Sequence, residues 1–138
     1  MGRFAAGLRV GLLAGTAAVA LVPELRRLSR SWSSRVAVVE TSMLPTLRPG
    51  DWLLVDPDAY RRRTPDAGDI VVVSDPREPD RLLVKRVVGV GPDGRLDLLG
   101  DDPSASTDSR EFGPVEPSAV QGRPWARYWP PRRWGSLG

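Results

Sequence analysis

Cysteine and histidine are both absent from the 138-residue sequence. Their absence excludes disulfide frameworks, thiol nucleophiles, the usual zinc sites and any catalytic triad with a histidine base. Lysine occurs only once, as Lys85, and all other basic residues are arginines. Arginine stays protonated, whereas lysine in an apolar setting can lose its proton near neutral pH. Lys85 is therefore the only side chain that could act as an amine base, unless an arginine-biased composition left it by chance.

The length allows one domain with a modest core, once an apolar N-terminal stretch is set aside. The net charge of +3 comes from arginines spread along the chain. A nucleic-acid footprint would be more concentrated, so we expect no nucleic-acid partner. We also expect no cofactor and no metal.

Residues Phe4 to Val22 are apolar except for Arg9, and this length suits a short transmembrane helix. A cleaved signal peptide, with Ala18-Val19-Ala20 resembling its cleavage site, and a peripheral helix are the alternatives. We predict an uncleaved anchor helix over residues 1–23 that holds the protein to a membrane, followed by a polar linker over residues 24–35.

From Val36 onward, short runs rich in β-branched residues alternate with Gly, Pro and Asp turns. This pattern predicts a mainly β fold, with one compact antiparallel domain over residues 36–138. Residues 56–67 and 74–81 are predicted to be long, exposed loops. The expected strands cover residues 36–39, 52–55, 70–73, 82–84 with 87–88, and 96–99.

The segment from Arg123 to Trp134 interleaves Trp and Tyr with arginines. Cross-strand packing of a terminal strand would explain this composition. Contact with a membrane interface is the second explanation, because Trp, Tyr and Arg all suit that boundary.

A serine hydroxyl becomes a useful nucleophile only when a neighbouring group takes its proton. Ser42 follows the first predicted strand at a turn, where its hydroxyl can stand at a strand end, although a plain turn residue would look the same. Strand alternation places Lys85 on the same face as Leu83 and Val87, and Arg86 on the other face. An inward lysine would lose its charge and could act as a base, whereas a lysine on an edge strand would reach the solvent.

Three segments resemble the signatures of type I signal peptidases, in the order found in that family. The first, Ser42-Met43-Leu44-Pro45-Thr46-Leu47 followed by Pro49-Gly50-Asp51, resembles the nucleophile segment. Lys85-Arg86-Val87-Val88-Gly89 resembles the lysine segment. The third comprises Gly100-Asp101-Asp102, Ser106-Thr107-Asp108-Ser109-Arg110 and Gly113.

The resemblance implies a β-rich catalytic domain of the signal peptidase type behind an N-terminal anchor, and a serine endopeptidase with a Ser/Lys dyad. It implies that Ser42 is the nucleophile, Lys85 the base, and Ser106 the hydroxyl that orients the lysine amine. The remaining matches concern the substrate groove and the architecture of the site. They are Met43 beside the nucleophile, Pro45 in its turn, and Asp108 with Arg110 as an ion pair.

Two positions depart from the family pattern. Glu40 stands two residues before Ser42, where the family often has Ser or Gly that can help the oxyanion hole. Because a carboxylate would repel an oxyanion, we expect Glu40 to point away and the backbone N–H of Ser42 to stabilise it. Asp102 replaces an asparagine near the rim.

The overall likeness is greatest to the nickel-type superoxide dismutase maturation proteases within that family. The expected function is therefore removal of an N-terminal extension from a precursor protein, with a nickel superoxide dismutase proprotein as the predicted substrate. A general signal peptidase that cleaves secretory precursors is the main alternative. A self-cleaving repressor would need DNA-binding helices before Val36, and a non-catalytic β-module that binds membranes or partners would leave Ser42, Lys85 and Ser106 without a joint explanation.

The family and the charge distribution favour opposite membrane orientations. Type I signal peptidases hold the catalytic domain outside the cytoplasm, whereas positive flanks usually stay inside. The arginine distribution favours a cytoplasmic catalytic domain, because Arg26, Arg27, Arg30 and Arg35 follow the apolar stretch and only Arg3 and Arg9 lie before or within it.

Overall fold

The computed structural model describes residues 22–32 and 34–138. Within this part of the chain, seven strands form one sheet in the order β1-β2-β6-β3-β4-β5, with β7 paired to β6. Every pairing is antiparallel, which confirms the predicted mainly β fold. The strands are β1 (Arg35–Ala37), β2 (Trp52–Asp56), β3 (Ile70–Asp75), β4 (Glu78–Val90), β5 (Leu96–Leu99), β6 (Val120–Trp129) and β7 (Gly135–Ser136). The short helices are α2 (Ser109–Phe112), η1 (Pro117–Ala119) and η2 (Pro131–Arg133).

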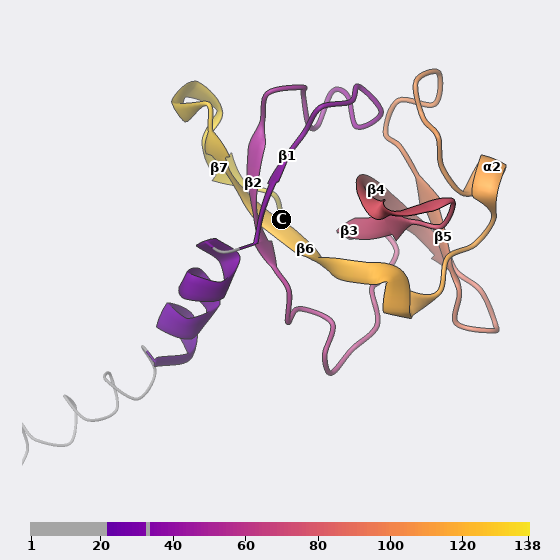
Figure 1. Ribbon diagram of the computed structural model, residues 1–138, viewed down its shortest axis with the longest axis horizontal. Helices are drawn as coiled ribbons and strands as arrows, with labels where there is room; N and C mark the ends of the chain where they lie inside the picture. The colour runs from indigo at the N-terminus through magenta and orange to yellow at the C-terminus, as the bar shows by residue number, and fades with distance from the viewer. Residues whose placement is uncertain (1–21, 33) are drawn as a thin grey trace, which may run out of the picture.

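Strand β6 joins the two halves of the sheet. It pairs with β2 and β7 in one half and with β3 in the other. Figure 1 shows β6 running across the molecule between these two groups of strands. The aromatic segment that the sequence pattern assigned to a terminal strand therefore lies largely in the middle of the sheet.

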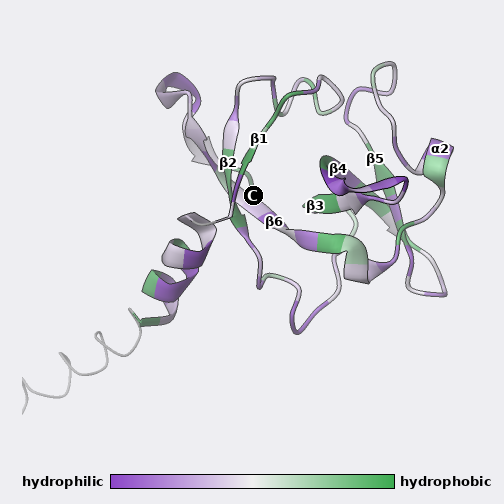
Figure 2. Cartoon of the chain, viewed as in Figure 1, coloured by the Kyte–Doolittle hydropathy of each residue, from purple (hydrophilic) through white to green (hydrophobic). Residues whose placement is uncertain are grey.

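Two clusters of buried side chains form the core, and Figure 2 shows hydrophobic residues along β1, β3 and β5. Each fully buried valine or leucine side chain contributes about 1.5–3 kcal/mol relative to an exposed one. The larger cluster packs β3, β4 and β5 together through Val71, Val73, Leu83, Val87, Leu96, Leu98 and Val115. The smaller one, which underlies the turn after β1, contains Val38, Met43, Leu47, Leu53 and Ile70.

Residues 74–81 do not form the long loop that their polar composition predicted. They belong mostly to a tight hairpin, in which Asp75 at the end of β3 pairs with Glu78 at the start of β4. The buried Asp75 carboxylate closes the turn by accepting hydrogen bonds from the backbone N–H of Arg77 at 2.9 Å and from its guanidinium at 3.0 and 3.1 Å. Asp often stabilises turns in this way, and such local bonding outweighs polarity as a guide to a loop.

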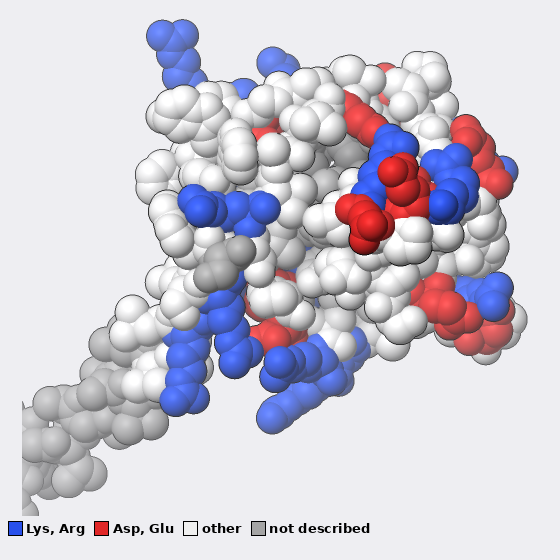
Figure 3. Space-filling model, in the orientation of Figure 1, with Lys and Arg blue, Asp and Glu red and all other residues white. Residues whose placement is uncertain are grey.

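Residues 22–32, most of them in the predicted linker, form a helix whose basic side chains stand out in Figure 3. The helix contacts the domain through a hydrogen bond of 3.1 Å from Trp125 Nε1 to Ser31 Oγ and an ion pair of 3.3 Å between Arg27 and Asp56. Residues 1–21 of the predicted anchor lie outside the described part of the chain. Among the described residues, no helix has the length and apolar character needed to cross a membrane.

Candidate active site

Lys85 is fully buried in the middle of β4. Leu83 and Val87, two residues away on either side, are buried on the same face, whereas Arg86 is only partly buried, as strand alternation predicted. Burial disfavours the charged ammonium and lowers the pKa of Lys85 from its ordinary value of 10.5. The sheet thus provides an amine whose neutral form is favoured, and that form is required of a general base.

The Ser106 hydroxyl is the polar partner of this amine. Its oxygen accepts hydrogen bonds from Lys85 Nζ at 3.2 Å and from the backbone N–H of Gly100 at 3.1 Å. Its own hydrogen is donated to Asp108 Oδ2 at 2.6 Å. Because that hydrogen is committed to Asp108, Ser106 can only accept from the amine. A neutral Lys85 would therefore keep its lone pair free for another proton donor.

Asp108 and Arg110 hold Ser106 in this orientation. Asp108 is buried at the start of α2, and Arg110 binds its two carboxylate oxygens with Nε at 2.9 Å and a terminal nitrogen at 3.0 Å. Although burial raises the pKa of Asp108, hydrogen bonds from Arg110 and Ser106 lower it well below the ordinary range. The ion pair that the family resemblance implied is present, and it keeps an acceptor for the Ser106 hydroxyl over the physiological pH range.

Ser42 lies in the turn that follows β1 and is buried. Its carbonyl oxygen accepts a hydrogen bond of 2.8 Å from the backbone N–H of Asp102, which ties this turn to the segment after β5. Met43 fills the small core cluster beneath the turn. Pro45, after a cis peptide bond, lies exposed farther along the same turn.

Gly100 brings the serine segment and the lysine's partner into contact. A Cβ atom at this position would lie 2.5 Å from the carbonyl oxygen of Ser42 and 2.3 Å from Ser106 Oγ. Both distances are far below van der Waals contact, so only glycine allows the two serine segments to approach this closely. The three motifs of the sequence therefore meet at one place.

A small pocket of about 110 Å³ leads to Ser42. One wall comes from β1 and the residues after it, and the other comes from β4. At this pocket Glu40 does not stand free: its carboxylate forms an ion pair with Arg81 on the opposite wall. The apolar lining residues are Val36, Ala37, Val38, Val39, Met43, Leu82, Leu83 and Val84.

Sequence reasoning missed a second polar link across the site. Arg86 binds Asp101 through two hydrogen bonds of 2.8 Å, and Asp101 also accepts one of 2.6 Å from the Thr46 hydroxyl. The link connects the serine turn, β4 and the segment after β5. The pairing of β4 with β5 could have predicted this link. Arg86 pairs with Leu99, and Asp101 follows Leu99 by two residues.

Comparison with known proteins agrees with this geometry. The family model described as "Signal peptidase, peptidase S26" matches residues 12–94, which include Ser42 and Lys85. The chain is 39% identical to mitochondrial ATP-independent inner membrane protease subunit 1a of Arabidopsis thaliana, over 70% of each chain. It is 36% identical to mitochondrial inner membrane protease subunit 2 of Danio rerio, over 72% of this chain and 66% of that one.

A bacterial relative is the protein named "Probable signal peptidase I-1" of Synechocystis, which is 26% identical over 70% of this chain and 71% of its own length. Nothing in these comparisons points to the nickel superoxide dismutase branch that overall likeness had suggested. The family match covers more than half of the chain, and it is consistent with the three motifs that meet around Gly100. The chain belongs to the signal peptidase S26 family and is a serine-type endopeptidase.

Proposed function

We propose that this peptidase removes an N-terminal extension from precursor proteins at a membrane, with Ser42 as nucleophile and Lys85 as general base. The buried Lys85 amine donates to a Ser106 hydroxyl that can only accept from it, and Gly100 lets this hydroxyl approach the turn of Ser42, which lines an apolar pocket.

In the proposed reaction, the neutral Lys85 amine takes the proton of the Ser42 hydroxyl as its oxygen attacks the scissile carbonyl. The backbone N–H of Ser42 stabilises the developing oxyanion. The lysine ammonium then gives its proton to the leaving amine, and a water activated by the same lysine hydrolyses the acyl-enzyme. Met43 and the apolar walls would hold the substrate, while Asp108 and Arg110 keep Ser106 in place.

The relatives are a better guide to the substrate class than the overall likeness to dismutase maturation proteases. The relatives named above include inner membrane proteases and a signal peptidase, which supports a precursor delivered to a membrane, such as a secretory protein. A nickel superoxide dismutase proprotein is the second candidate. The two candidates differ in the orientation that they favour. Secretory precursors are cleaved outside the cytoplasm, whereas the cytoplasmic catalytic domain that the arginine count favours would suit maturation of a cytoplasmic metalloenzyme.

Incubation of the purified protein with one secretory precursor and one dismutase proprotein tests both proposals. We expect the secretory precursor to lose a defined N-terminal segment, and sequencing the new N-terminus locates the cleaved bond. The Ser42→Ala variant controls for contaminating peptidases. Selective cleavage of the dismutase proprotein would reverse the choice of substrate, and cleavage of neither precursor would contradict the proposed function.

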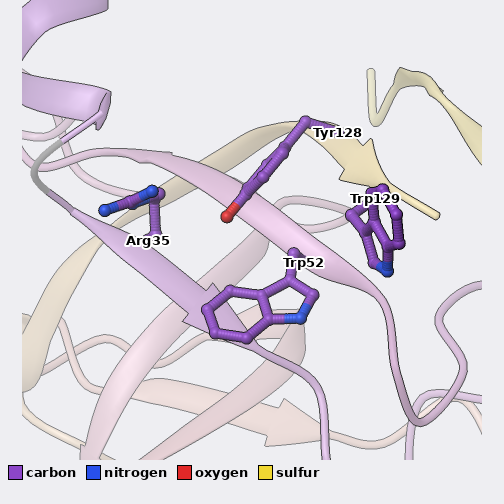
Figure 4. Close-up of a pocket in the computed structure, with 4 residues that line it drawn as sticks. All are labelled: Arg35, Trp52, Tyr128 and Trp129. Atoms are coloured by element: carbon purple, nitrogen blue, oxygen red, sulfur yellow. The ribbon is translucent and has the colours of Figure 1, made fainter. Parts of the chain in front are cut away.

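An aromatic surface supports the membrane part of this proposal. Arg35, Trp52, Tyr128 and Trp129 line a shallow pocket of about 500 Å³ at the ends of β1, β2 and β6 (Figure 4). Tyr128 also lies 5.8 Å, ring to ring, from Trp32 on the helix of residues 22–32. Tryptophan, tyrosine and arginine are the side chains that favour the membrane–water boundary. The surface is continuous with the helix that follows the predicted anchor.

Quenching of tryptophan fluorescence by brominated phospholipids tests this contact in the full chain reconstituted into vesicles. We expect bromine to quench part of the wild-type emission, and the quenched part to fall by about half when Trp52 and Trp129 are both replaced by phenylalanine. Trp125→Phe is the matched control, because that indole is partly buried between the domain and the helix, where it is hydrogen-bonded to Ser31. Equal quenching in both variants would show that the aromatic surface does not face lipid.

A further inference from the structure

An ion pair spans the pocket beside the proposed dyad. Glu40 lies two residues before Ser42, and Arg81 lies four residues before Lys85 on β4. Their side chains are paired, and both residues line the pocket that leads to Ser42. Figure 3 shows acidic and basic side chains interleaved over the β3–β4 hairpin, the region from which Arg81 comes.

Arg81 comes from the same strand as the lysine and reaches the pocket beside it. Arg81 lies just before the regular part of β4, where the register with β3 shifts, and it lines the pocket together with Leu83, whose buried side chain shares a strand face with Lys85. Glu40 belongs to the segment that carries the nucleophile. The pair therefore joins the element that holds the base to the element that holds Ser42.

The two charges act on the Lys85 amine in opposite directions. After burial, which lowers the pKa of Lys85 most, the Glu40 carboxylate raises it and the Arg81 guanidinium lowers it. Asp108 and Asp75 are the other charged groups that face this lysine, and both raise its pKa.

Those two aspartates already have arginine partners of their own. Asp108 is bound by Arg110 at 2.9 Å, and Asp75 by Arg77 at 3.0 Å. Glu40 without Arg81 would be the one carboxylate of the three that has no partner. Each acidic group that reaches the lysine is thus matched by a guanidinium.

We propose that Arg81 is a positioning residue that cancels the charge of Glu40, so that the amine stays neutral and no free carboxylate opposes the oxyanion. This inference rests on the proposed function of Ser42 and Lys85. A carboxylate at position 40 would otherwise hinder proton transfer to Lys85 and repel the oxyanion. Pairing with Arg81 explains how the chain tolerates an acidic residue there.

The two single variants should shift the pH dependence of kcat/KM in opposite directions. In Arg81→Gln the carboxylate is unopposed, so the ammonium is stabilised and the rise of kcat/KM with pH moves to higher pH. At neutral pH we expect kcat/KM to fall by about tenfold, because a partly exposed charge is screened and matters less than a buried oxyanion donor. In Glu40→Gln the lone guanidinium moves the rise to lower pH. The double variant should return close to the wild-type profile.

The single lysine allows a measurement that does not depend on activity. Protein labelled with ¹³C at lysine Cε gives one signal, from Lys85, whose chemical shift follows protonation of the amine. Titrations of the wild type, both single variants and the double variant should show midpoints displaced upward in Arg81→Gln, downward in Glu40→Gln, and restored in the double variant.

The matched control is the pair Arg95 and Glu116, which is exposed to a similar degree and lies away from the pocket. Replacing both with glutamine should leave the Lys85 titration and the pH profile unchanged. Coincident titrations in all pocket variants would overturn the inference, whether or not the protein cleaves a precursor. Loss of cleavage in the wild type with the expected displacements would instead count against the peptidase assignment and leave the charge pairing in place.

Discussion

Replacing Ser42 with alanine is expected to lower kcat by about four to six orders of magnitude, as the loss of a nucleophile does in other serine hydrolases. The change deletes one oxygen from a small buried side chain, while the backbone carbonyl that binds Asp102 is retained. The fold and substrate binding should therefore survive. Single-turnover cleavage of a precursor, together with a thermal unfolding curve, measures both expectations.

The neighbouring Thr41→Ala is the matched control, because it removes a hydroxyl from the same turn at an exposed position. That variant should retain activity within a few-fold of the wild type. If Ser42→Ala retained activity within about tenfold, Ser42 would not be the nucleophile.

Lys85→Arg is expected to inactivate the enzyme almost as completely, although it preserves the positive charge. A guanidinium does not lose its proton at neutral pH and cannot accept one from a serine hydroxyl. Because arginine is also bulkier at a fully buried site, Lys85→Met provides a second variant of similar length without a charge. Both should be inactive, and the methionine variant should remain folded.

The same assignment fixes the sign of the pH dependence. The protonated amine cannot act as a base, so the rate should rise as the pH passes upward through the pKa of Lys85. Burial lowers that pKa, so the rise should occur below the ordinary value of 10.5. A flat rate from mildly acidic to alkaline pH, or an active arginine variant, would contradict a lysine base.

Local patterns in the sequence were enough to place the buried lysine. Alternation along residues 82–88 predicted the inward face of Lys85 and the outward face of Arg86, because a strand between buried neighbours has little freedom to rotate. The family motifs also identified Ser106 and the pair of Asp108 and Arg110. Those residues lie close together in the chain, so the contact between them is largely a local property.

Contacts between residues far apart in the chain could not be predicted from local patterns alone. The pair of Glu40 and Arg81 joins residues 41 positions apart, and the link from Arg86 to Asp101 depends on the register of two strands. With nineteen arginines in the chain, charge alone does not say which of them meets a given carboxylate. The hairpin at residues 74–81 was missed because its turn is closed by a side chain within a polar segment.

The central position of β6 has a consequence for biosynthesis. Every residue proposed to act in the reaction precedes Val120, yet β2 and β3 are both completed by a strand that starts there. During translation, the two halves of the sheet have no strand between them until residues 120–129 emerge from the ribosome, and such long-range pairing forms late. A nascent chain would thus carry the serine and the lysine before the sheet around them is complete, which delays full proteolytic activity until β6 has paired.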